Sequence, residues 1–395
     1  MTLGDMFAQT ADWAAIVCYA IAAIGCVYAL VAAWSVHNFL RSAPTALAAS
    51  GPAVTILKPL HGSEPDLYAN LAGFCVQDYP GAVQIVFGLD SPDDPAIDVV
   101  HRLIADFPDR ELTLTVNARR HGSNAKVSNL INMVEQARHD VLVLSDSDIA
   151  VDCDYLKRIV ASLEQPGVGL VTSLYRGEAA SEQSSRLWSR FAAAAIDYHF
   201  LPNVLVGLSF NMAAPCFGST IALRRETLAA VGGFEAVANQ LADDYALGAL
   251  VRRAGLTVAM PALTVTHVCA ERSAREFFAH ELRWARTIRS IDPLGYAGLA
   301  LTHALPLALL GILFGGITPL SIIAVAALAC RFTLQVELDR AFRLRDDVFW
   351  LGPVRDILSF AVFVASFFGR GVEWRGRRYG VRADSTLAYY GEAKS

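Results

Sequence analysis

Residues 141–149 read VLVLSDSDI, so that four apolar residues run directly into Ser145, Asp146, Ser147 and Asp148. A short apolar run that ends in polar turn residues predicts a buried strand over 141–144. Carboxylates two positions apart on an extended chain project to the same side, which suits one hard divalent cation that bridges to the phosphates of a nucleotide. Because Asp and Ser also favour turns and helix caps, the motif alone leaves a structural role open.

Other short β-rich runs flank this one and alternate with helical patterns. The runs cover 54–57, 83–89, 112–116 and 168–172, with amphipathic helical stretches such as 97–107 and 128–137 between them. This alternation predicts an α/β domain with a mainly parallel sheet, in which ligands bind beyond the carboxyl ends of the strands. Acidic residues occur there again, because the run that ends at residue 89 leads into Asp90, Asp93 and Asp94.

Outside this region the chain is unusually apolar. Its 395 residues carry a formal charge of −5 with 54% hydrophobic and only 18% charged residues, whereas soluble domains have about 25% charged residues. Residues 13–36 and 294–330 contain no Asp, Glu, Lys or Arg, and both runs exceed the roughly 20 residues that cross a bilayer core. These features predict an N-terminal transmembrane anchor at 1–40, a globular domain at 41–293, and a C-terminal membrane region with a basic tail at 294–395.

The charges around the first apolar segment predict its orientation. The segment is too long for the apolar part of a signal peptide, and its leader holds Asp5 and Asp12 but no Lys or Arg. Since Arg41 and Lys58 follow it, the positive-inside bias places the N-terminus outside and the globular domain in the cytoplasm.

Two more apolar segments follow the globular region. Gly315 and Pro319 near the middle of the second segment predict a helical hairpin of two short passes. The third segment, 348–369, contains Arg355 and Asp356, so it either stays at or dips into the interface, or makes a third full crossing. The basic run that follows is expected to stay cytoplasmic; it consists of Arg370, Arg375, Arg377 and Arg378.

Composition also excludes several classes of protein. An acidic chain without basic runs lacks the charge pattern of a nucleic-acid binder. A polytopic transporter would need most of its chain inside the bilayer, whereas about two thirds here has soluble composition. The seven cysteines are an odd number without CxxC spacing, so neither a disulfide framework nor a zinc knuckle is expected.

Two further clusters lie downstream. Residues 241–245 read LADDY and place Asp243 and Asp244 at the start of a helical pattern, and residues 280–284 read HELRW shortly before the second apolar segment. Alone, the first is explained as a helix cap and the second as an Arg/Trp belt at a membrane surface. Their order after the other acidic motifs favours a shared catalytic site.

Taken together, these motifs resemble the family-2 glycosyltransferases with a D, D, D, (Q/R)xxRW pattern, and within them the ceramide glucosyltransferases and their bacterial hopanoid-biosynthesis relatives. The resemblance covers most of the chain from about residue 54 to residue 378 and implies a GT-A-type nucleotide-sugar-binding fold. The last motif begins with His280, where the general pattern has Gln or Arg. The matching stretches are FGLDSPDDPAID (87–98), HGSNAKVSNL (121–130), VLVLSDSDI (141–149), GLVTSLYRG (169–177), CFGSTIALRRETLAAVGGF (216–234), LADDYALGALVRR (241–253), HELRWARTIR (280–289) and WRGRRYG (374–380).

The resemblance assigns roles on the donor side of the site. It places Asp94 in the nucleotide pocket, with Asp90 beside it, and Lys126 near the nucleotide. It makes Asp146 and Asp148 the pair that binds a divalent cation, Mg²⁺ or Mn²⁺, and the donor diphosphate.

On the acceptor side, the resemblance makes Asp244 the general base and places Arg283 and Trp284 beside the acceptor and the diphosphate. His280 belongs with the nucleotide-sugar-binding residues through its place in the motif. His267 follows a strand-like run and is a candidate to complete the metal shell, although a single His beside apolar neighbours is more often structural.

The chemistry of sugar transfer explains these residue types. A sugar leaves a nucleoside diphosphate only when the departing phosphate charge is neutralised, here by a metal ion and an Arg. An alcohol acceptor must lose its proton as it attacks the anomeric carbon, so a carboxylate is required opposite the leaving group. A single direct displacement inverts the anomeric carbon.

The favoured function is therefore an inverting transfer from a UDP-sugar to the hydroxyl of a membrane lipid. The resemblance implies N-acetylglucosamine transfer to a bacteriohopanepolyol at the bacterial inner membrane, with UDP-glucose transfer to ceramide as the alternative. A processive polysaccharide synthase is more distant, because the few predicted spans offer too little helix for a channel. A catalytically silent membrane scaffold is the remaining alternative, and it predicts that Asp146→Asn and Asp244→Asn leave function intact.

Overall fold

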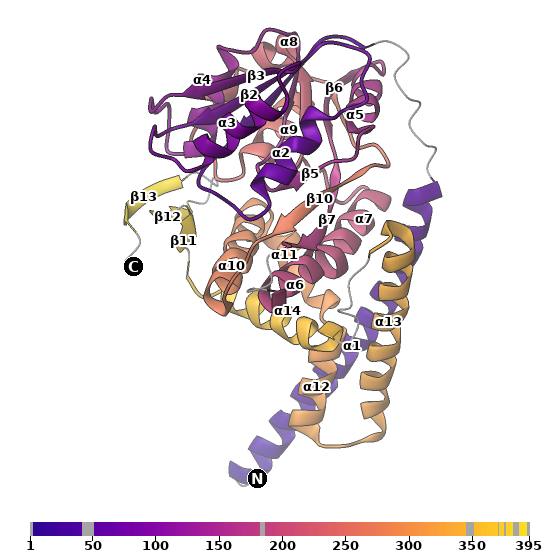
Figure 1. Ribbon diagram of the computed structural model, residues 1–395. Helices are drawn as coiled ribbons and strands as arrows, with labels where there is room; N and C mark the ends of the chain where they lie inside the picture. Colours follow the sequence, from indigo (N-terminus) through magenta and orange to yellow (C-terminus); the bar gives the residue numbers. More distant parts are fainter. Residues whose placement is uncertain are drawn as a thin grey trace.

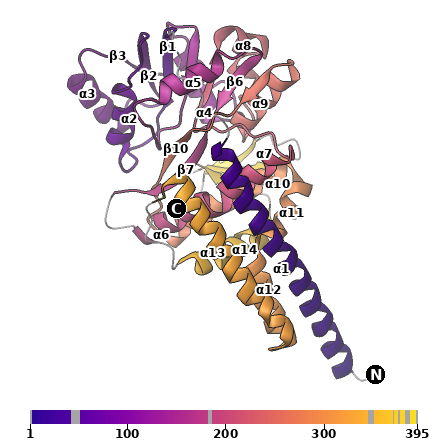
Figure 2. The same cartoon turned by 90° about the vertical axis from the view of Figure 1, so that its right-hand side faces the viewer.

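The computed structural model describes residues 3–41, 51–181, 186–344, 351–369, 371–374, 377–381 and 387–392. Figure 1 shows an α/β domain at one end, a layer of shorter helices beside it, and long apolar helices at the other end. The first of these long helices is α1 (Leu3–Arg41), and the N-terminus lies at its end farthest from the α/β domain (Figures 1 and 2).

The α/β domain is built on a seven-stranded sheet. Its strands lie in the order β3 (Glu111–Val116), β2 (Val83–Leu89), β1 (Val54–Pro59), β4 (Val141–Leu144), β8 (Ile221–Arg224), β6 (Val168–Thr172) and β9 (Thr257–Ala259). β8 runs antiparallel to both of its neighbours, and the other pairs are parallel. The prediction of an α/β fold with a mainly parallel sheet is confirmed.

Helices cover both faces of this sheet. α2 (Leu67–Cys75), α3 (Ala96–Asp106) and α5 (Tyr155–Leu163) pack on one face, and α4 (Ala125–Val134), α8 (Arg225–Ala230) and α9 (Asp243–Arg253) pack on the other. Alternate residues of a strand point to opposite faces, so Val141 and Val143 of β4 join the first core and Leu142 and Leu144 join the second. Burial on both sides explains why β4 is a continuous apolar run and why its neighbours β1 and β2 are mostly apolar.

A smaller sheet joins the α/β domain to the helical layer. It consists of β5 (Ile149–Ala150), β10 (Thr264–Cys269) and β7 (Leu174–Ala179), with β10 in the middle. β5 begins directly after Asp148, so this sheet extends from the end of β4 toward the helices.

The helical layer contains α6 (Arg186–Ala195), a π-helical turn η2 (Ile196–Phe200), α7 (Leu201–Ser209), α10 (Ala274–Ile291) and α11 (Pro293–Gly298). Leu201 and Leu205 of α7 pack with Val36 of α1 and with Leu338 of α13 (Ile322–Phe342). The layer therefore shares a core with the long apolar helices.

Among the described residues, three helical stretches are long and apolar enough to cross a membrane: Gln9–Phe39, Leu187–Ser209 and Pro319–Phe342. A fourth candidate is the pair Pro293–Thr302 and Ala304–Gly315, bent by 69°. In the apolar 18-residue window of Leu187–Ser209, 72% is buried within the protein, against 22% in the windows of each of the other two. Protein rather than lipid therefore surrounds it.

The helices α1, α12 (Ala304–Gly315) and α13 lie side by side (Figures 1 and 2). They expose many apolar side chains. Soluble proteins rarely expose apolar patches of this extent, so this part of the chain is membrane-embedded. The exposed side chains include Trp13, Ile16, Val17, Ile24, Val27, Leu30 and Trp34 of α1, and Leu309, Leu313, Phe314, Ile317, Leu320, Ile322 and Val325 of the α12–α13 region.

The predicted hairpin corresponds to α12 and α13, which are joined through η5 (Pro319–Ser321). Its second limb continues to Phe342, so it is longer than the uncharged run that ends at residue 330. The extension carries charged side chains that pack against the helical layer.

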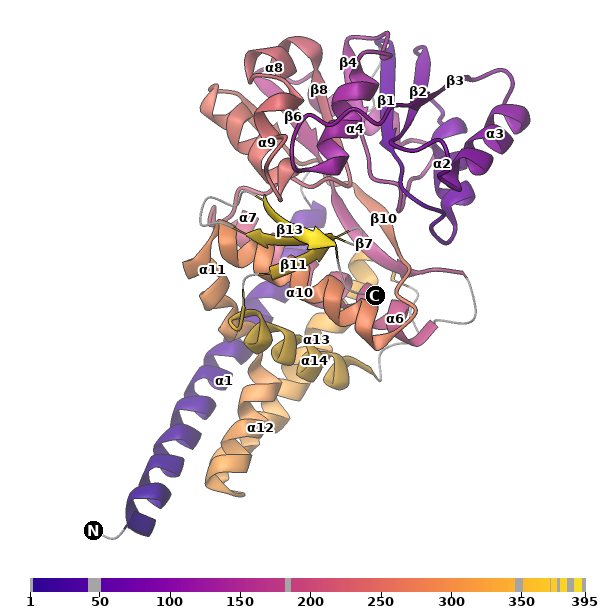
Figure 3. The same cartoon turned by 90° about the vertical axis from the view of Figure 1, so that its left-hand side faces the viewer.

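The third apolar segment forms α14 (Gly352–Ser366), which runs across the direction of α12 and α13 (Figures 1 and 3). It is not among the described helices long and apolar enough to span a membrane, and the choice between the interfacial alternative and a third crossing stays a prediction. After it come β11 (Gly371–Trp374), β12 (Arg377–Val381) and β13 (Leu387–Glu392), an antiparallel sheet beside α10 (Figure 3). Arg370 and Arg375 of the basic run lie outside the described residues.

Candidate active site

A cavity of about 510 Å³ lies between the carboxyl ends of β1 and β4, the start of α9, and α10. Eight of the ten predicted site residues line it: Lys126, Asp146, Asp148, Asp244, His267, His280, Arg283 and Trp284. Asp90 and Asp94 do not. A larger open hollow of about 1,380 Å³ beside β7 and β10 contains none of the ten.

The turn after β4 is held in place by a buried lysine. Lys58 of β1 is fully buried, and its Nζ donates a hydrogen bond of 2.5 Å to the backbone oxygen of Asp146. The same ammonium lies 3.9 Å from the centre of the Phe74 ring. Burial lowers the pKa of Lys58 to about 7, although the nearby carboxylates of Asp146 and Asp148 oppose the shift. Sequence reasoning used Lys58 only as a topology signal and missed this contact.

Lys126 enters the cavity from the first turn of α4 and pairs with Asp146. Its Nζ lies 2.6 Å from Oδ1 of Asp146 and 3.7 Å from Oδ2 of Asp243. Burial alone would lower the pKa of Lys126, but the carboxylates around it, Asp146 first, raise the pKa above its ordinary value. The lysine therefore stays protonated. It neutralises part of the charge of the carboxylates around it, Asp146, Asp243 and Asp244, which together form an acidic cluster.

Asn124, which caps α4, also holds the loop that leads into Asp243. The Asn124 side chain accepts a hydrogen bond from the backbone N–H of Val127, which satisfies the start of α4. Its amide group donates to the backbone oxygen of Gln240 at 2.8 Å and to Oδ1 of Asp243 at 3.2 Å. One side chain thus sets the distance between the Lys126 helix and the LADDY motif.

Asp148 carries the feature that fits a metal ion. Its Oδ2 lies 3.6 Å from Nδ1 of His267, and its Oδ1 is buried without a hydrogen-bond partner among the described residues. A buried carboxylate oxygen without a partner is costly, and a divalent cation satisfies it. Asp146 and Asp148 supply carboxylate oxygens of the type that Mn²⁺ and Mg²⁺ prefer, and His267 places an imidazole nitrogen beside them.

Asp244 is held at the start of α9. Its Oδ2 accepts a hydrogen bond of 2.9 Å from the backbone N–H of Gly218, and its Oδ1 accepts one of 2.8 Å from that of Tyr245. Burial and the adjacent Asp243 carboxylate raise the pKa of Asp244 to about 6, although Lys126 opposes the shift. A carboxylate with this pKa is ionised near neutral pH and is a stronger base than an ordinary aspartate.

Gly218 allows the acidic cluster to close around Lys126. A Cβ at this position would lie 2.8 Å from Oδ2 of Asp146 and 2.8 Å from Nζ of Lys126. A side chain at this position would push the Asp146 carboxylate and the Lys126 ammonium out of place, so glycine permits their close approach.

One face of α10 forms the opposite wall. The helix begins after Ser273, whose side chain accepts a hydrogen bond from the backbone N–H of Glu276. Residues three and four apart share a helix face, and the residues of α10 that line the cavity are Glu276, His280, Arg283, Trp284 and Thr287. The HELRW motif therefore faces the acidic cluster across the cavity.

His280 is paired with a buried carboxylate. Its Nδ1 lies 2.5 Å from Oε1 of Glu271, and its ring packs against Trp284 with centroids 4.5 Å apart. Burial would raise the pKa of Glu271, but the hydrogen bond and the charge of His280 lower it below its ordinary value. The ionised Glu271 holds the proton of His280 on Nδ1. No motif in the sequence pointed to Glu271.

Glu271→Gln should lower the rate of sugar transfer by roughly tenfold. In metal sites, loss of the carboxylate that orients a histidine costs about 10- to 100-fold in activity, and we expect the lower end because the His280 ring also packs on Trp284. Steady-state kinetics on detergent-purified protein would measure the change. Glu276→Gln, on the same wall, is the matched control, and equal losses in both variants would contradict a special role for Glu271.

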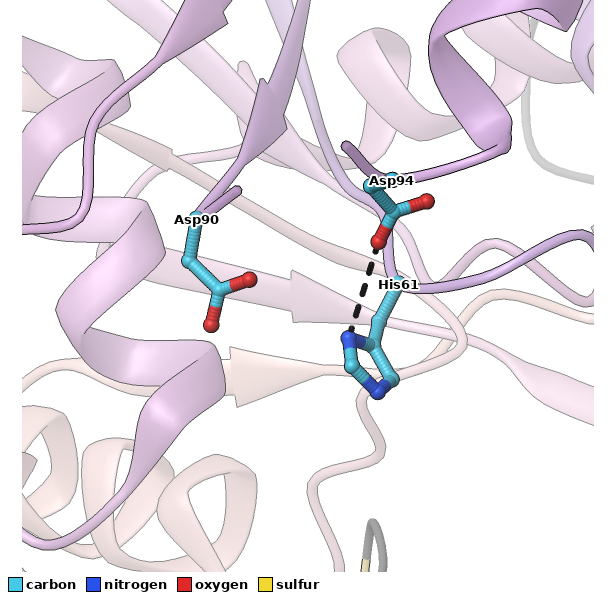
Figure 4. A group of neighbouring side chains, drawn as sticks. All are labelled: His61, Asp90 and Asp94. Atoms are coloured by element: carbon cyan, nitrogen blue, oxygen red, sulfur yellow. Dashed lines mark ion pairs between the residues drawn. The ribbon is translucent and has the colours of Figure 1, made fainter. Parts of the chain in front are cut away.

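Asp90 and Asp94 of the first acidic motif do not line the cavity. Figure 4 shows His61, Asp90 and Asp94 pointing toward one another, and their ligand atoms lie within 4.8 Å. Asp94 is buried and accepts hydrogen bonds from the backbone N–H groups of Gly62 and Ala96.

These contacts make the triad a weaker candidate for a cation than the Asp146 turn. Asp90 forms an ion pair of 2.7 Å with Arg120, and Asp94 anchors the loop that follows β1. Asp94 reaches the cavity only through His61, which lines it and whose Nδ1 lies 3.7 Å from Oδ2 of Asp94. Nucleotide binding by Asp90 and Asp94 stays a prediction.

Comparison with known proteins gives a consistent result. The sequence profile of glycosyl transferase family 21 matches residues 17–387. Ceramide glucosyltransferase 1 of Caenorhabditis elegans is 23% identical over 254 residues, which cover 64% of this chain and 52% of the relative. An N-acetylglucosaminyltransferase of Bradyrhizobium diazoefficiens is 24% identical over 246 residues, which cover 60% of this chain and 49% of the relative. The chain thus spans about half the length of these curated relatives.

A solved structure shares the fold. A mannosyltransferase of Pyrobaculum calidifontis, determined with GDP-Man and Mn²⁺, superposes with a TM-score of 0.50 at 21% sequence identity. The match covers 91% of this chain and 99% of the mannosyltransferase. It supports the GT-A-type arrangement of the α/β domain.

Proposed function

The chain belongs to glycosyl transferase family 21, and on this premise we propose that it transfers a sugar from a UDP-sugar to the hydroxyl of a membrane lipid with inversion. One observation carries the proposal. A single cavity holds a carboxylate with a raised pKa, a carboxylate pair with a lysine, and a His/Arg/Trp wall, and the helix that forms this wall leads directly to the membrane helices.

The residues divide the reaction between two sides of the cavity. Asp146, Asp148 and His267 are the residues that would hold a divalent cation, which when bound supplies positive charge to the departing diphosphate. Lys126 and Arg283 add the positive charge of the protein itself. Asp244 accepts the proton of the acceptor hydroxyl, and its raised pKa suits that role.

We propose N-acetylglucosamine as the donor sugar and a bacteriohopanepolyol as the acceptor, with glucose transfer to ceramide as the second candidate. The resemblance of the FGSTIALRRETL, LADDY and HELRWARTIR stretches to the bacterial hopanoid enzymes supports the first pair. The similarity to ceramide glucosyltransferases supports the second. The proposed location is the bacterial inner membrane, with several crossings and the α/β domain in the cytoplasm.

The rate of transfer should fall as the pH is lowered through about 6, by about tenfold for each further pH unit, because only ionised Asp244 accepts a proton. The folded-state pKa of Asp244 exceeds its ordinary value of 3.8, so this group makes folding more favourable as the pH falls. The loss of rate is therefore not expected from unfolding at this residue. Measurements of kcat/KM and thermal unfolding between pH 4.5 and 8 would test this, and a rate that stays flat down to pH 4.5 would contradict it.

Donor and acceptor are best resolved in one experiment. Radiolabelled UDP-glucose and UDP-N-acetylglucosamine are each offered to purified protein in vesicles that contain either ceramide or a hopanoid polyol. If only the combination of UDP-N-acetylglucosamine with the hopanoid polyol yields labelled lipid, the result supports N-acetylglucosamine transfer to a hopanoid. Labelled glucosylceramide supports glucose transfer to ceramide. Failure of all four combinations, with the protein folded and Mn²⁺ present, would reject both.

A further inference from the structure

Two adjacent charged residues of α14 are buried although the segment around them is apolar. The Arg355 side chain is 1% exposed and the Asp356 side chain is 7% exposed. Ionisable groups among membrane-associated helices are costly, and they persist where they have a specific partner and a role. Both residues form ion pairs with residues on other elements, so this short stretch of α14 connects α10, η2 and α13.

Arg355 contacts α10, the helix that forms one wall of the cavity. Its Nη2 contacts Oε2 of Glu281, and its guanidinium lies 5.3 Å from the centre of the Phe277 ring. Phe277 and Glu281 are four residues apart, so they share one face of α10. His280 and Arg283 lie on the adjacent face and line the cavity.

Asp356 ties the same turn of α14 to two other elements. Its Oδ1 lies 2.9 Å from Nε2 of His199 in η2, and its Oδ2 lies 2.9 Å from Nε of Arg331 in α13. Arg331 also donates to the backbone oxygen of Tyr198 at 3.4 Å. The position of α14 is therefore fixed against a membrane helix and against the buried helical layer.

We propose that the Arg355–Glu281 pair is a positioning pair, which holds the α10 wall in register with the acidic cluster across the cavity. The inference rests on the proposed function. An apolar contact between α10 and α14 would be non-directional, whereas a buried ion pair fixes one geometry. A shift of about 1 Å in a positioning group costs about 100-fold in rate, so loosening this pair should lower kcat.

The test compares two double variants. Arg355→Met with Glu281→Gln removes both charges together, since removal of one alone would leave an unpaired buried charge and endanger folding. Glu337→Gln with Arg340→Gln is the matched control, because it removes an exposed ion pair of α13. Size-exclusion chromatography and thermal unfolding first establish that both variants fold.

Kinetics provide the first readout. The Arg355/Glu281 variant should lose at least about tenfold in kcat, and the KM for the UDP-sugar should change less than kcat does, because Arg283 and His280 lie on the loosened wall whereas Lys126, Asp146 and Asp148 of the α/β domain are untouched. The control variant should keep both constants. A folded Arg355/Glu281 variant with unchanged kcat would overturn the inference.

Distance measurement provides a second readout that does not need activity. Spin-labelled amino acids at the exposed positions Ala279 of α10 and His101 of α3 report the separation between the wall and the α/β domain. The distance distribution should be narrow in the parent and control proteins and broader in the Arg355/Glu281 variant. A narrow distribution in that variant would overturn the inference, whereas a broad one in a protein inactive on every donor would count against the proposed function alone.

Discussion

Asp244→Asn should reduce sugar transfer by about 10²- to 10⁴-fold, which is the usual contribution of a positioned general base. The substitution keeps the shape of the side chain and one acceptor oxygen toward Gly218, but it replaces the oxygen that accepts from Tyr245 with an NH₂ group and removes the group that takes the proton of the acceptor hydroxyl. Because Asp244 acts on the acceptor, binding of the donor should change little. Steady-state kinetics give the rate, and calorimetry with UDP gives the donor affinity.

The neighbouring Asp243 provides the control for this prediction. Its carboxylate faces Asn124 and Lys126 and has the same formal charge as Asp244. Asp243→Asn should therefore cost much less in kcat, although it removes an equal charge from the cavity. Similar losses of kcat in the two variants would show that the rate depends on the net charge of the cavity rather than on proton transfer to Asp244. This result would contradict the assignment of Asp244 as the general base.

Asp148→Asn should lower transfer by roughly 100-fold or more, since stabilisation of the leaving group by a metal site is worth several kcal/mol and each 1.36 kcal/mol is tenfold in rate. The reason is the buried Oδ1 of Asp148, which has no hydrogen-bond partner among the described residues and lies beside His267. The variant should also bind Mn²⁺ more weakly, which electron paramagnetic resonance of the free ion measures without any turnover.

Ser147→Ala tests whether the effect is specific to the carboxylate. Ser147 lies in the same turn and donates to Oε2 of Glu64 at 2.8 Å, so its loss perturbs the turn without removing a metal-binding group. Mn²⁺ affinity should be retained in this variant. Unchanged Mn²⁺ affinity in Asp148→Asn would contradict the proposed metal site.

Several strands of the α/β domain could be predicted because buried strands consist mainly of apolar residues, which are recognisable in the sequence. β2, β4 and β6 have the predicted bounds, since both faces of these strands are covered and most of their residues are apolar. β8 was not predicted, and it is the strand that runs against its neighbours. Its residues, Ile221–Arg224, run directly into α8, which begins at Arg225, so no turn residues mark the end of the strand in the sequence.

The site was predictable where its residues follow strands or share a helix face. Asp146 and Asp148 come directly after β4, and His280, Arg283 and Trp284 recur at helical spacing, so sequence order implied their proximity. Lys58 and Glu271 were missed because their roles depend on contacts between distant segments. The stretch 348–369 was left between two alternatives because the partners of Arg355 and Asp356 lie on three other elements.

The central claim is that sugar transfer takes place in the cavity between the Asp146 turn, Asp244 and the α10 wall. A structure of the protein determined with UDP and Mn²⁺ tests it most directly. We predict the diphosphate between Asp146 and Arg283, with Mn²⁺ at Asp148 and with Asp244 facing the side from which an acceptor enters. UDP bound instead in the larger hollow beside β7 and β10, with the cavity empty, would contradict the claim.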